Sequence, residues 1–517
     1  MRRENRFRRG ILLVLAGVCG APLLARGADL RLVRAMEERD QAAVRALLAE
    51  RVDVNAASAD GATALHWAAH WDDAVAAELL LRAGADANAA NDHGVTPLSL
   101  ACLNRSAKLV GMLLAAGAHP NAAQWTGETP LMTCARTGAA EAVRLLLDHG
   151  ADPNARETIH GQTALMWALA ERHPSVALTL IERGADIRAR TKGGFTPLMF
   201  AAQQGDLDSA KALLAAGADV NESTPEYGNA LLIAASSGQE AVALYLLEQG
   251  ADPNAADANG VTALHWAVAQ GLTSLIGVRY DPDYRVQPRN MPALAKALLA
   301  AGAHPNARIQ RSFSRGPDGS QFSLAQATPF FLAAVSADPQ MMRILAAGGA
   351  DPRLRNSEEV TPLMAAAAAV CTGSCWSRGG NRDSDAAREA ERVALEAVRM
   401  AVELGSDINA TSKIGQTAMH QAAFTGADTI VQFLADHGAN VDVPDENGET
   451  PWSMAAGISP VLRYRGQYGY HQSTAELLLK LGAKPRTREQ MDTRSDASKR
   501  GGYPAPAAAA PPAARAQ

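Results

Sequence analysis

The chain alternates short apolar stretches with polar, glycine-rich segments at a regular interval. Most apolar stretches open with Thr-Pro-Leu or Thr-Ala-Leu, and about 21 residues after the Thr comes a Gly-Ala-Asp/His-x-Asn segment. The opening Thr stands at 63, 96, 129, 163, 196, 262, 328, 361, 417 and 450, with Asn229 at the equivalent place in one further copy. Most steps between these positions are 33 residues, so the chain repeats one unit.

Each unit predicts two short helices and a turn. Thr is a good N-cap and Pro fits the first helical position, so the opening tripeptide predicts the start of a first helix. Two places after the Thr the residue is always large and apolar, and five places after it the residue is Ala in every copy except Cys134. This pairing of large and small residues predicts helices that pack closely along one line. A second helix, such as residues 141–148, ends at a Gly, and the Asp/Asn/Gly-rich segment that follows predicts a turn.

These residues resemble the ankyrin repeat, whose Thr-Pro-Leu-His motif is matched most fully at Thr63-Ala64-Leu65-His66 and again from Thr262 and Thr417. The resemblance covers residues 29–485 in eleven in-register copies, and residues 29–56 look like a further, capping repeat without the motif. It implies an all-α fold of helix pairs with β-hairpin turns, an ankyrin-repeat solenoid of about 12 repeats. It also implies that one histidine in each of the three fullest copies ties the helix start to the turn; these are His66, His265 and His420. At Asn229 the capping Thr and the Gly two places earlier are both missing, which leaves the geometry of that hairpin open.

Four insertions interrupt the period of the repeat domain, which we assign to residues 28–485. They lie near 272–290, 308–322, 371–393 and 457–470, and three of them fall between the first and second helices of alternate repeats. They are rich in Tyr and Arg, the residue types that binding hot spots favour. The insertions are therefore either a second binding surface or ordered spacers whose aromatic side chains pack on the edge of the solenoid.

The two ends of the chain differ from the repeats. Five arginines precede an apolar run at residues 11–25, which predicts a signal peptide over residues 1–27 with cleavage after Gly27. Fifteen helical residues span about 22 Å, too little for a membrane core of roughly 30 Å. A lipoprotein signal at Cys19 is the weaker alternative, because Val18 stands where a small residue is needed. We therefore expect a bacterial periplasmic or secreted protein with no membrane span after cleavage, and a disordered Pro/Ala-rich tail at 486–517.

Charge and cysteine content narrow the function further. The net charge is −5, but residues 1–27 carry +5 and residues 485–517 carry +3, so the part between them carries −13. Such an acidic body argues against nucleic-acid binding. Cys102 and Cys134 stand at small-residue positions of first helices and are expected to be buried thiols. Cys371 and Cys375 are expected to form a disulfide in an oxidising compartment, with a redox-active pair as the alternative. The tryptophans four places after the Thr are expected in the core; they are Trp67, Trp167 and Trp266.

The sequence predicts a binding protein without catalysis, cofactor or metal. It holds no H-E-x-x-H, no phosphate-binding glycine loop and no G-x-S-x-G, and the Asp-rich segment near Asp252 has neither the spacing nor the final Glu of a calcium loop. We expect an exported, monomeric scaffold for protein–protein interaction. The alternatives are a secreted effector that binds a host protein and a thiol-redox protein that uses Cys371 and Cys375.

Two groups of residues are candidates for contact with the partner. The first follows the hairpin tips and the exposed ends of first helices, where ankyrin-like proteins usually bind: Trp71, Asp92, His93, Trp125, Arg136, Gln203, Gln204 and Tyr227. The second lies in the insertions: Tyr280, Tyr284, Tyr464, Tyr468 and Tyr470.

Overall fold

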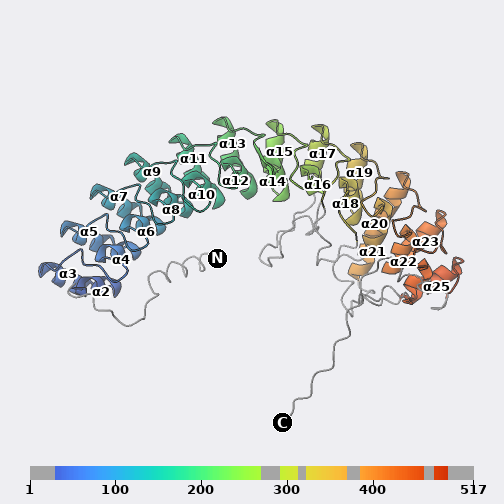
Figure 1. Cartoon of the computed structure of the whole chain (residues 1–517), viewed down its shortest axis with the longest axis horizontal. Coiled ribbons are helices and arrows are strands. Elements are labelled where there is room, and N and C mark those ends of the chain that lie inside the picture. Colours follow the sequence, from blue (N-terminus) through green and yellow to red (C-terminus); the bar gives the residue numbers. More distant parts are fainter. Residues whose placement is uncertain (1–28, 269–290, 312–321, 370–384, 459–470, 487–517) are drawn as a thin grey trace, which may run out of the picture. The chain divides into compact units, whose positions relative to one another are not determined.

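The computed structural model describes residues 29–268, 291–311, 322–369, 385–458 and 471–486. Within these residues 24 helices follow one another in pairs, so that each pair forms one of twelve repeats (Figure 1). The all-α fold and the number of repeats that the sequence predicts are confirmed. The predicted signal peptide lies outside the described residues, and so does the predicted tail beyond Arg486.

The first compact unit comprises residues 1–224 and 229–251 and contains repeats 1 to 7. The helix pairs of these repeats are α2 (Arg31–Glu37) and α3 (Gln41–Ala49), α4 (Ala64–His70) and α5 (Ala74–Arg82), α6 (Pro97–Leu103) and α7 (Ala107–Ala115), α8 (Pro130–Thr137) and α9 (Ala140–Asp148), α10 (Ala164–Ala170) and α11 (Pro174–Glu182), α12 (Pro197–Gln204) and α13 (Leu207–Ala215), and α14 (Ala230–Ser236) and α15 (Glu240–Glu248). First helices pack on first helices and second helices on second helices, as in the contacts of α6 with α8 and of α7 with α9.

The second unit comprises residues 225–228 and 252–517 and contains repeats 8 to 12. Its helix pairs are α16 (Ala263–Ala267) and α17 (Pro292–Ala300), α18 (Pro329–Val335) and α19 (Pro339–Ala347), α20 (Pro362–Ala368) and α21 (Asp385–Glu403), α22 (Ala418–Thr425) and α23 (Asp428–Asp436), and α24 (Pro451–Ala455) and α25 (Gln472–Lys480). Neighbouring repeats stack here through the same rows of helices, with α20 packed on α22 and α21 on α23.

The repeated Thr starts the first helices as the sequence predicts. In α6, for example, the Thr96 backbone is extended, its hydroxyl accepts the Ser99 N–H, and Pro97 occupies the first turn. The residue five places after the Thr is fully buried in all eleven copies, including Cys134. The large residue two places after the Thr is also buried in every copy except the last, where Trp452 is half-buried. These two positions form the core between stacked first helices.

An asparagine that follows most of the described second helices joins each of these repeats to the next. The Asn88 amide nitrogen donates to the Gly117 carbonyl (2.9 Å), and its amide oxygen accepts the His119 N–H (2.7 Å). Gly117 has a φ of +87°, the left-handed conformation that ends a helix and that glycine adopts without strain. The same pair of bonds is made by Asn55, Asn121, Asn154, Asn254, Asn306 and Asn409.

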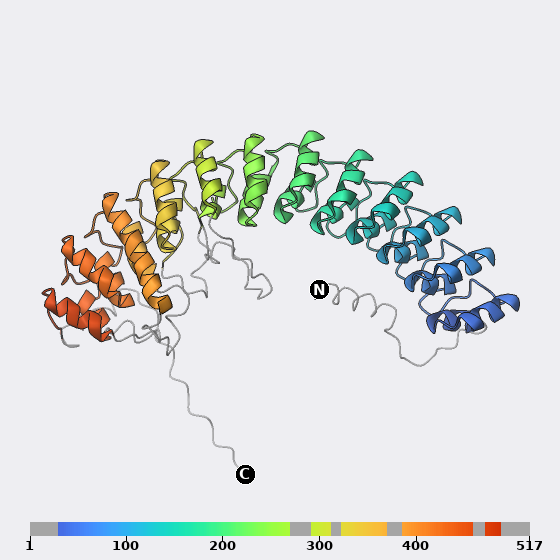
Figure 2. The same cartoon turned by 180° about the vertical axis from the view of Figure 1, so that it is seen from behind.

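Two of the predicted insertions overlap regular structure. Helix α21 begins at Asp385 and has 19 residues, against nine in most second helices, so residues 385–393 of the expected 371–393 insertion are helical (the long orange helix in Figure 2). Residues 308–311 belong to a hairpin in which the Ile309 N–H donates to Ala327 (3.1 Å) and the Gln326 N–H donates to Ile309 (2.7 Å). The remaining parts, at 269–290, 312–321, 370–384 and 459–470, lie outside the described residues.

Candidate partner-binding surface

The hairpin tips of repeats 2 to 6 are joined to one another through the backbone. Each tip donates one N–H to a carbonyl of the preceding tip, which holds neighbouring tips at a fixed spacing. These bonds run from Asp92 to Asp60 (2.9 Å), from Trp125 to His93 (3.1 Å), from Thr158 to Thr126 (2.8 Å) and from Lys192 to His160 (2.8 Å). The tips therefore form a continuous, preformed row rather than a set of independent loops.

A polar side chain shapes several of the tips from within. The Asn91 amide oxygen accepts the N–H groups of His93 (3.0 Å) and Val95 (2.9 Å), so the turn satisfies its own backbone donors. Asp257 and Asp445 make the equivalent bonds in other repeats.

Glu157 takes this role in the one hairpin that is a residue longer. The step from Thr129 to Thr163 is 34 residues, and the longer Glu side chain reaches the N–H groups of Ile159 (2.6 Å), His160 (2.7 Å) and Gln162 (2.9 Å). Burial alone would raise the pKa of the Glu157 carboxyl, but these backbone donors outweigh it and lower the pKa. The carboxylate is thus a structural acceptor at the base of the tip.

Two large apolar side chains project from adjacent tips of this row. Trp125 is 73% exposed and Ile159 is 56% exposed. Both lie four residues before the capping Thr of their repeat, but the hairpin of repeat 5 is one residue longer, and Thr158 makes the backbone bond that corresponds to that of Trp125. Sequence reasoning identified Trp125 but missed Ile159, for which the longer step of 34 residues was the available signal. Exposed apolar side chains on a rigid, backbone-bonded frame are suited to contact with an apolar partner.

The sequence predicted that Arg136 is exposed for contact with a partner, but its side chain is largely buried. Its guanidinium forms an ion pair with Glu128 (3.0 Å), and both side chains are only 14% exposed. The same Glu128 oxygen accepts the Thr133 hydroxyl (2.8 Å), and the Arg136 guanidinium lies 4.8 Å from the ring centre of Trp167. Arg136 therefore links repeat 4 to repeat 5 beneath the tips instead of offering a free cation to a partner.

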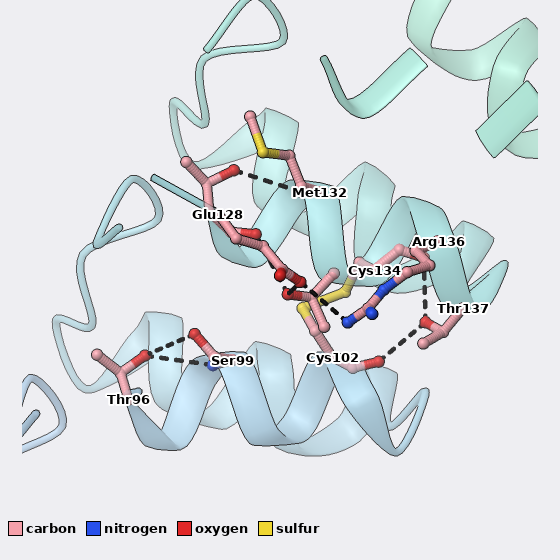
Figure 3. Close-up of a disulfide and its surroundings, with 10 residues drawn as sticks. Thr96, Ser99, Cys102, Glu128, Met132, Cys134, Arg136 and Thr137 are labelled. Atoms are coloured by element: carbon pink, nitrogen blue, oxygen red, sulfur yellow. Dashed lines mark hydrogen bonds and ion pairs between the residues drawn. A yellow bond between two sulfur atoms is a disulfide. The ribbon is translucent and has the colours of Figure 1, made fainter. Parts of the chain in front are cut away.

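Cys102 and Cys134 form a disulfide, which corrects the expectation of two free thiols (Figure 3). Cys102 lies on α6 and Cys134 on α8, with Cα atoms 4.6 Å apart, and both residues are fully buried. First helices pack closely enough here for their β-carbons to meet, so a covalent bond fits between them. Cys371 and Cys375 lie outside the described residues, so their predicted disulfide stays a prediction.

The other predicted contact residues are spread over the first unit and the β-hairpin that follows α13. Asp92 and His93 are exposed on the tip of repeat 3. The backbone bond from Trp125 to His93 holds this tip next to that of Trp125. Trp71 is exposed at the end of α4, where it stacks on Trp67 and is covered by Arg39. In α12, Gln203 is exposed and Gln204 is half-buried. Tyr227 is exposed on the tip between β1 (Ser223–Thr224) and β2 (Gly228–Asn229). Tyr280, Tyr284, Tyr464, Tyr468 and Tyr470 lie outside the described residues.

The hairpin at Asn229 keeps the usual helix start without Thr. The Asn229 side chain accepts the Leu232 N–H (3.0 Å), so Asn replaces Thr as the N-cap of α14.

Of the three tryptophans expected in the core, Trp266 is buried, whereas Trp67 and Trp167 are half-buried. Their outer faces contact Trp71 and Arg136 respectively.

The three motif histidines are structural. In His265, Nδ1 accepts the Thr262 N–H (3.1 Å), which requires Nδ1 to be unprotonated, and Nε2 donates to the Ala307 carbonyl (3.1 Å) of the next repeat. His66 and His420 make the same pair of bonds. Burial lowers the pKa of all three imidazoles, that of His265 to about 4. Each imidazole therefore serves as a neutral link between the helix start and the next hairpin.

The described residues hold neither a candidate metal site nor a candidate membrane span. No three His, Cys, Asp or Glu side chains among them are grouped so that they could hold a metal ion. None of the helices described here combines the length and the apolar character that a membrane span requires.

Comparison with known proteins gives consistent matches to one family. The family model for ankyrin repeats, built on three copies, matches residues 32–124, 121–191, 198–280 and 385–489, together about two thirds of the chain. Human ankyrin repeat and SOCS box protein 16 is 37% identical over 162 residues, which are 31% of this chain and 29% of that protein. The mouse protein of the same name is 32% identical over 131 residues, 25% of this chain and 26% of that protein. The chain thus spans less than a third of the length of these relatives.

Solved structures are also similar to the chain, and one of them serves as an example. The ankyrin repeat domain of human ASB11 is 27% identical, with a TM-score of 0.39, and the match covers 43% of this chain and 98% of that domain.

Proposed function

The chain belongs to the ankyrin repeat family, and from that premise we propose that it is an exported scaffold that binds a protein partner through the hairpin tips of repeats 4 and 5. Members of this family are usually binding proteins without catalytic activity. The observation that carries the proposal is the pair of exposed apolar side chains, Trp125 and Ile159, on neighbouring tips that are bonded to each other through the backbone. A surface that is already ordered loses little conformational entropy when a partner binds.

The interior beneath these tips supports the same assignment. The disulfide joins repeats 3 and 4, and the contact of Arg136 with Trp167 joins repeats 4 and 5. Repeats 3, 4 and 5 are therefore tied together, and two of them carry Trp125 and Ile159 on their tips. We infer that a partner offers an apolar patch to Trp125 and Ile159, because these large apolar side chains are exposed on neighbouring tips, while the charges of Glu128 and Arg136 pair with each other.

Two features support export. The arginine-rich start followed by an apolar run is typical of a signal peptide. The disulfide between Cys102 and Cys134 is of the kind that persists in oxidising compartments and is rare where thiols are kept reduced. We therefore propose that the protein acts in the periplasm or outside a bacterial cell.

Site-specific photo-crosslinking tests the binding surface. A photoreactive residue placed at 125 or 159 is expected to capture the same partner in the producing cell, whereas one at Leu479 is not. Leu479 is a matched control because it is apolar and 41% exposed but lies on α25. Trp125→Ala should then weaken that partner's binding by about 2 kcal/mol, or roughly thirtyfold, without lowering Tm. Equal capture from all three positions, or unchanged affinity of the Trp125→Ala variant, would contradict the proposal.

A further inference from the structure

The cysteine pair stands where most other repeat interfaces carry two alanines. Cys102 is six places after Thr96, and Cys134 is five places after Thr129. At the next interface the same two positions are Ala135 and Ala168, which are also fully buried. The equivalent pairs elsewhere include Ala69 with Ala101, Ala202 with Ala234, Ala334 with Ala366, Ala367 with Ala422, and Ala423 with Ala455. Close packing of first helices is thus achieved with methyl groups alone, and the sulfur atoms add only the covalent bond.

This bond joins the repeat whose hairpin tip carries Trp125 to the repeat before it. The Thr137 hydroxyl donates to the backbone carbonyls of Cys102 (3.0 Å) and Cys134 (3.2 Å), which closes the C-terminal end of the same interface (Figure 3). Two residues after Cys134, Arg136 reaches the half-buried Trp167 of repeat 5. The link between repeats 3 and 4 therefore lies directly next to the link between repeats 4 and 5.

We propose that the Cys102–Cys134 disulfide is a redox-controlled lock that fixes the interface between repeats 3 and 4 after export and thereby makes the binding surface rigid. The stability of a repeat array depends on the interfaces between neighbours, so one covalent bond opposes local opening of the repeats on either side. This inference rests on the proposed function, which locates the binding surface on the hairpin tips of repeats 4 and 5. It adds that the same chain holds a looser surface in a reducing compartment than in an oxidising one.

The lock closes by thiol–disulfide exchange with an oxidised dithiol or another disulfide-bearing oxidant. The thiolate of one cysteine attacks the oxidant's disulfide, and a mixed disulfide forms as one oxidant sulfur leaves. The thiolate of the other cysteine then attacks the protein sulfur of the mixed disulfide, so that the protein disulfide forms and the oxidant leaves as a dithiol with the two electrons. Because both cysteines are fully buried once α6 and α8 pack, the exchange takes place before the interface closes.

Oxidative refolding of the full chain tests the lock directly. The reduced, denatured protein is refolded with and without oxidised glutathione, and peptides are mapped without reductant. We expect a peptide pair linked through Cys102 and Cys134 only when the oxidant is present. Amides of residues 97–137 should then exchange at least about tenfold more slowly than in the reduced protein, while those of α12 and α13 stay unchanged.

The C102A/C134A double variant is the matched control, because it reproduces the alanine pair of the other interfaces. It should fold, exchange like the reduced wild type in residues 97–137, and show no response of these residues to oxidant. In that background, the A135C/A168C variant should form a new link under the same conditions and move the slow exchange to residues 130–170.

The outcomes separate this proposal from the proposed export. A chain that is not exported would contain free thiols in the cell but would still form the link on oxidative refolding. Absence of the link after refolding, or equal exchange in the oxidised, reduced and C102A/C134A forms, would overturn the lock.

Discussion

Repeats 3 to 5 and repeats 8 to 11 use the same helix positions but hold their neighbours together by different chemistry. In repeats 3 to 5 a disulfide and a largely buried ion pair of Glu128 with Arg136 connect the first helices and hairpins. In the second region, the neutral His265 links repeat 8 to repeat 9, and the neutral His420 links repeat 11 to repeat 12. Repeats 10 and 11 also share a cap between second helices, in which Glu391 of α21 accepts the N–H (2.9 Å) and the hydroxyl (2.7 Å) of Thr429 in α23.

The difference shows how repeats of the same design, in different parts of one chain, can respond to different solution conditions. The link between repeats 3 and 4 depends on the oxidation state of two sulfurs. The histidine links of the second region depend on imidazoles that must stay unprotonated at Nδ1 to accept a backbone N–H. We therefore expect redox conditions to affect the first region and acidity to affect the second.

The largest expected effect is the loss of stability of repeats 8 to 11 in acid. The folded pKa of His265 is about 4, below the usual 6.5, so the unfolded chain binds a proton between these values that the folded chain does not. Stability is complete above pH 6.5 and falls as the pH drops toward 4, by up to about 3 kcal/mol from this residue. Hydrogen exchange at pH 7 and pH 5, corrected for intrinsic rates, should show the larger loss of protection in residues 263–300 than in residues 97–148.

His265→Gln provides the control for this comparison. Its stability should be lower at pH 7 but should vary less with pH, because the glutamine does not titrate. Equal loss of protection in the two regions of the wild type, or an unchanged pH dependence in the variant, would show that the buried imidazoles do not set the acid response.

A smaller effect is expected at the long hairpin of repeat 5. Glu157→Gln replaces an acceptor-only carboxylate with an amide and removes charge from three hydrogen bonds, which should cost about 2 kcal/mol. Asn91→Asp is the control, because Asp257 and Asp445 already fill the same place elsewhere. Urea unfolding should place the Glu157→Gln variant well below the wild type and Asn91→Asp close to it. The reverse order would contradict the assigned role of Glu157.

The smallest effect concerns the cap between α21 and α23. Glu391→Ala should cost about 1 kcal/mol, because α23 starts after Ala427, which has no capping side chain. Glu396→Ala changes the same residue type on the same helix but removes only an exposed pair with Arg392, so its cost should be smaller. Protection of the α23 amides is the measurement, and equal effects of the two variants would exclude the cap.

The sequence predicts the repeat frame well because each helix start depends on local chemistry. Thr96 with Pro97 defines a cap and a first turn within four residues, and the 33-residue period repeats that signal. The start of α21 at Asp385 was not predicted, since helix formers inside an insertion carry no signal of the repeat.

The candidate site was less predictable because it depends on contacts between repeats. Arg136 has the position of an exposed residue, and only the partners Glu128 and Trp167 show that it points inward. The disulfide had a usable signal, since Cys102 and Cys134 are 32 residues apart, one less than the period. Knowing that positions five and six of neighbouring repeats face each other requires the structure.

Mass spectrometry of the protein recovered from the periplasmic or extracellular fraction, digested without reductant, tests the central claim most directly. An exported scaffold with a locked surface predicts a mature N-terminus near Ala28 and a linked peptide pair containing Cys102 and Cys134. An intact N-terminus in the cytoplasmic fraction, with both of these cysteines free, would contradict the account.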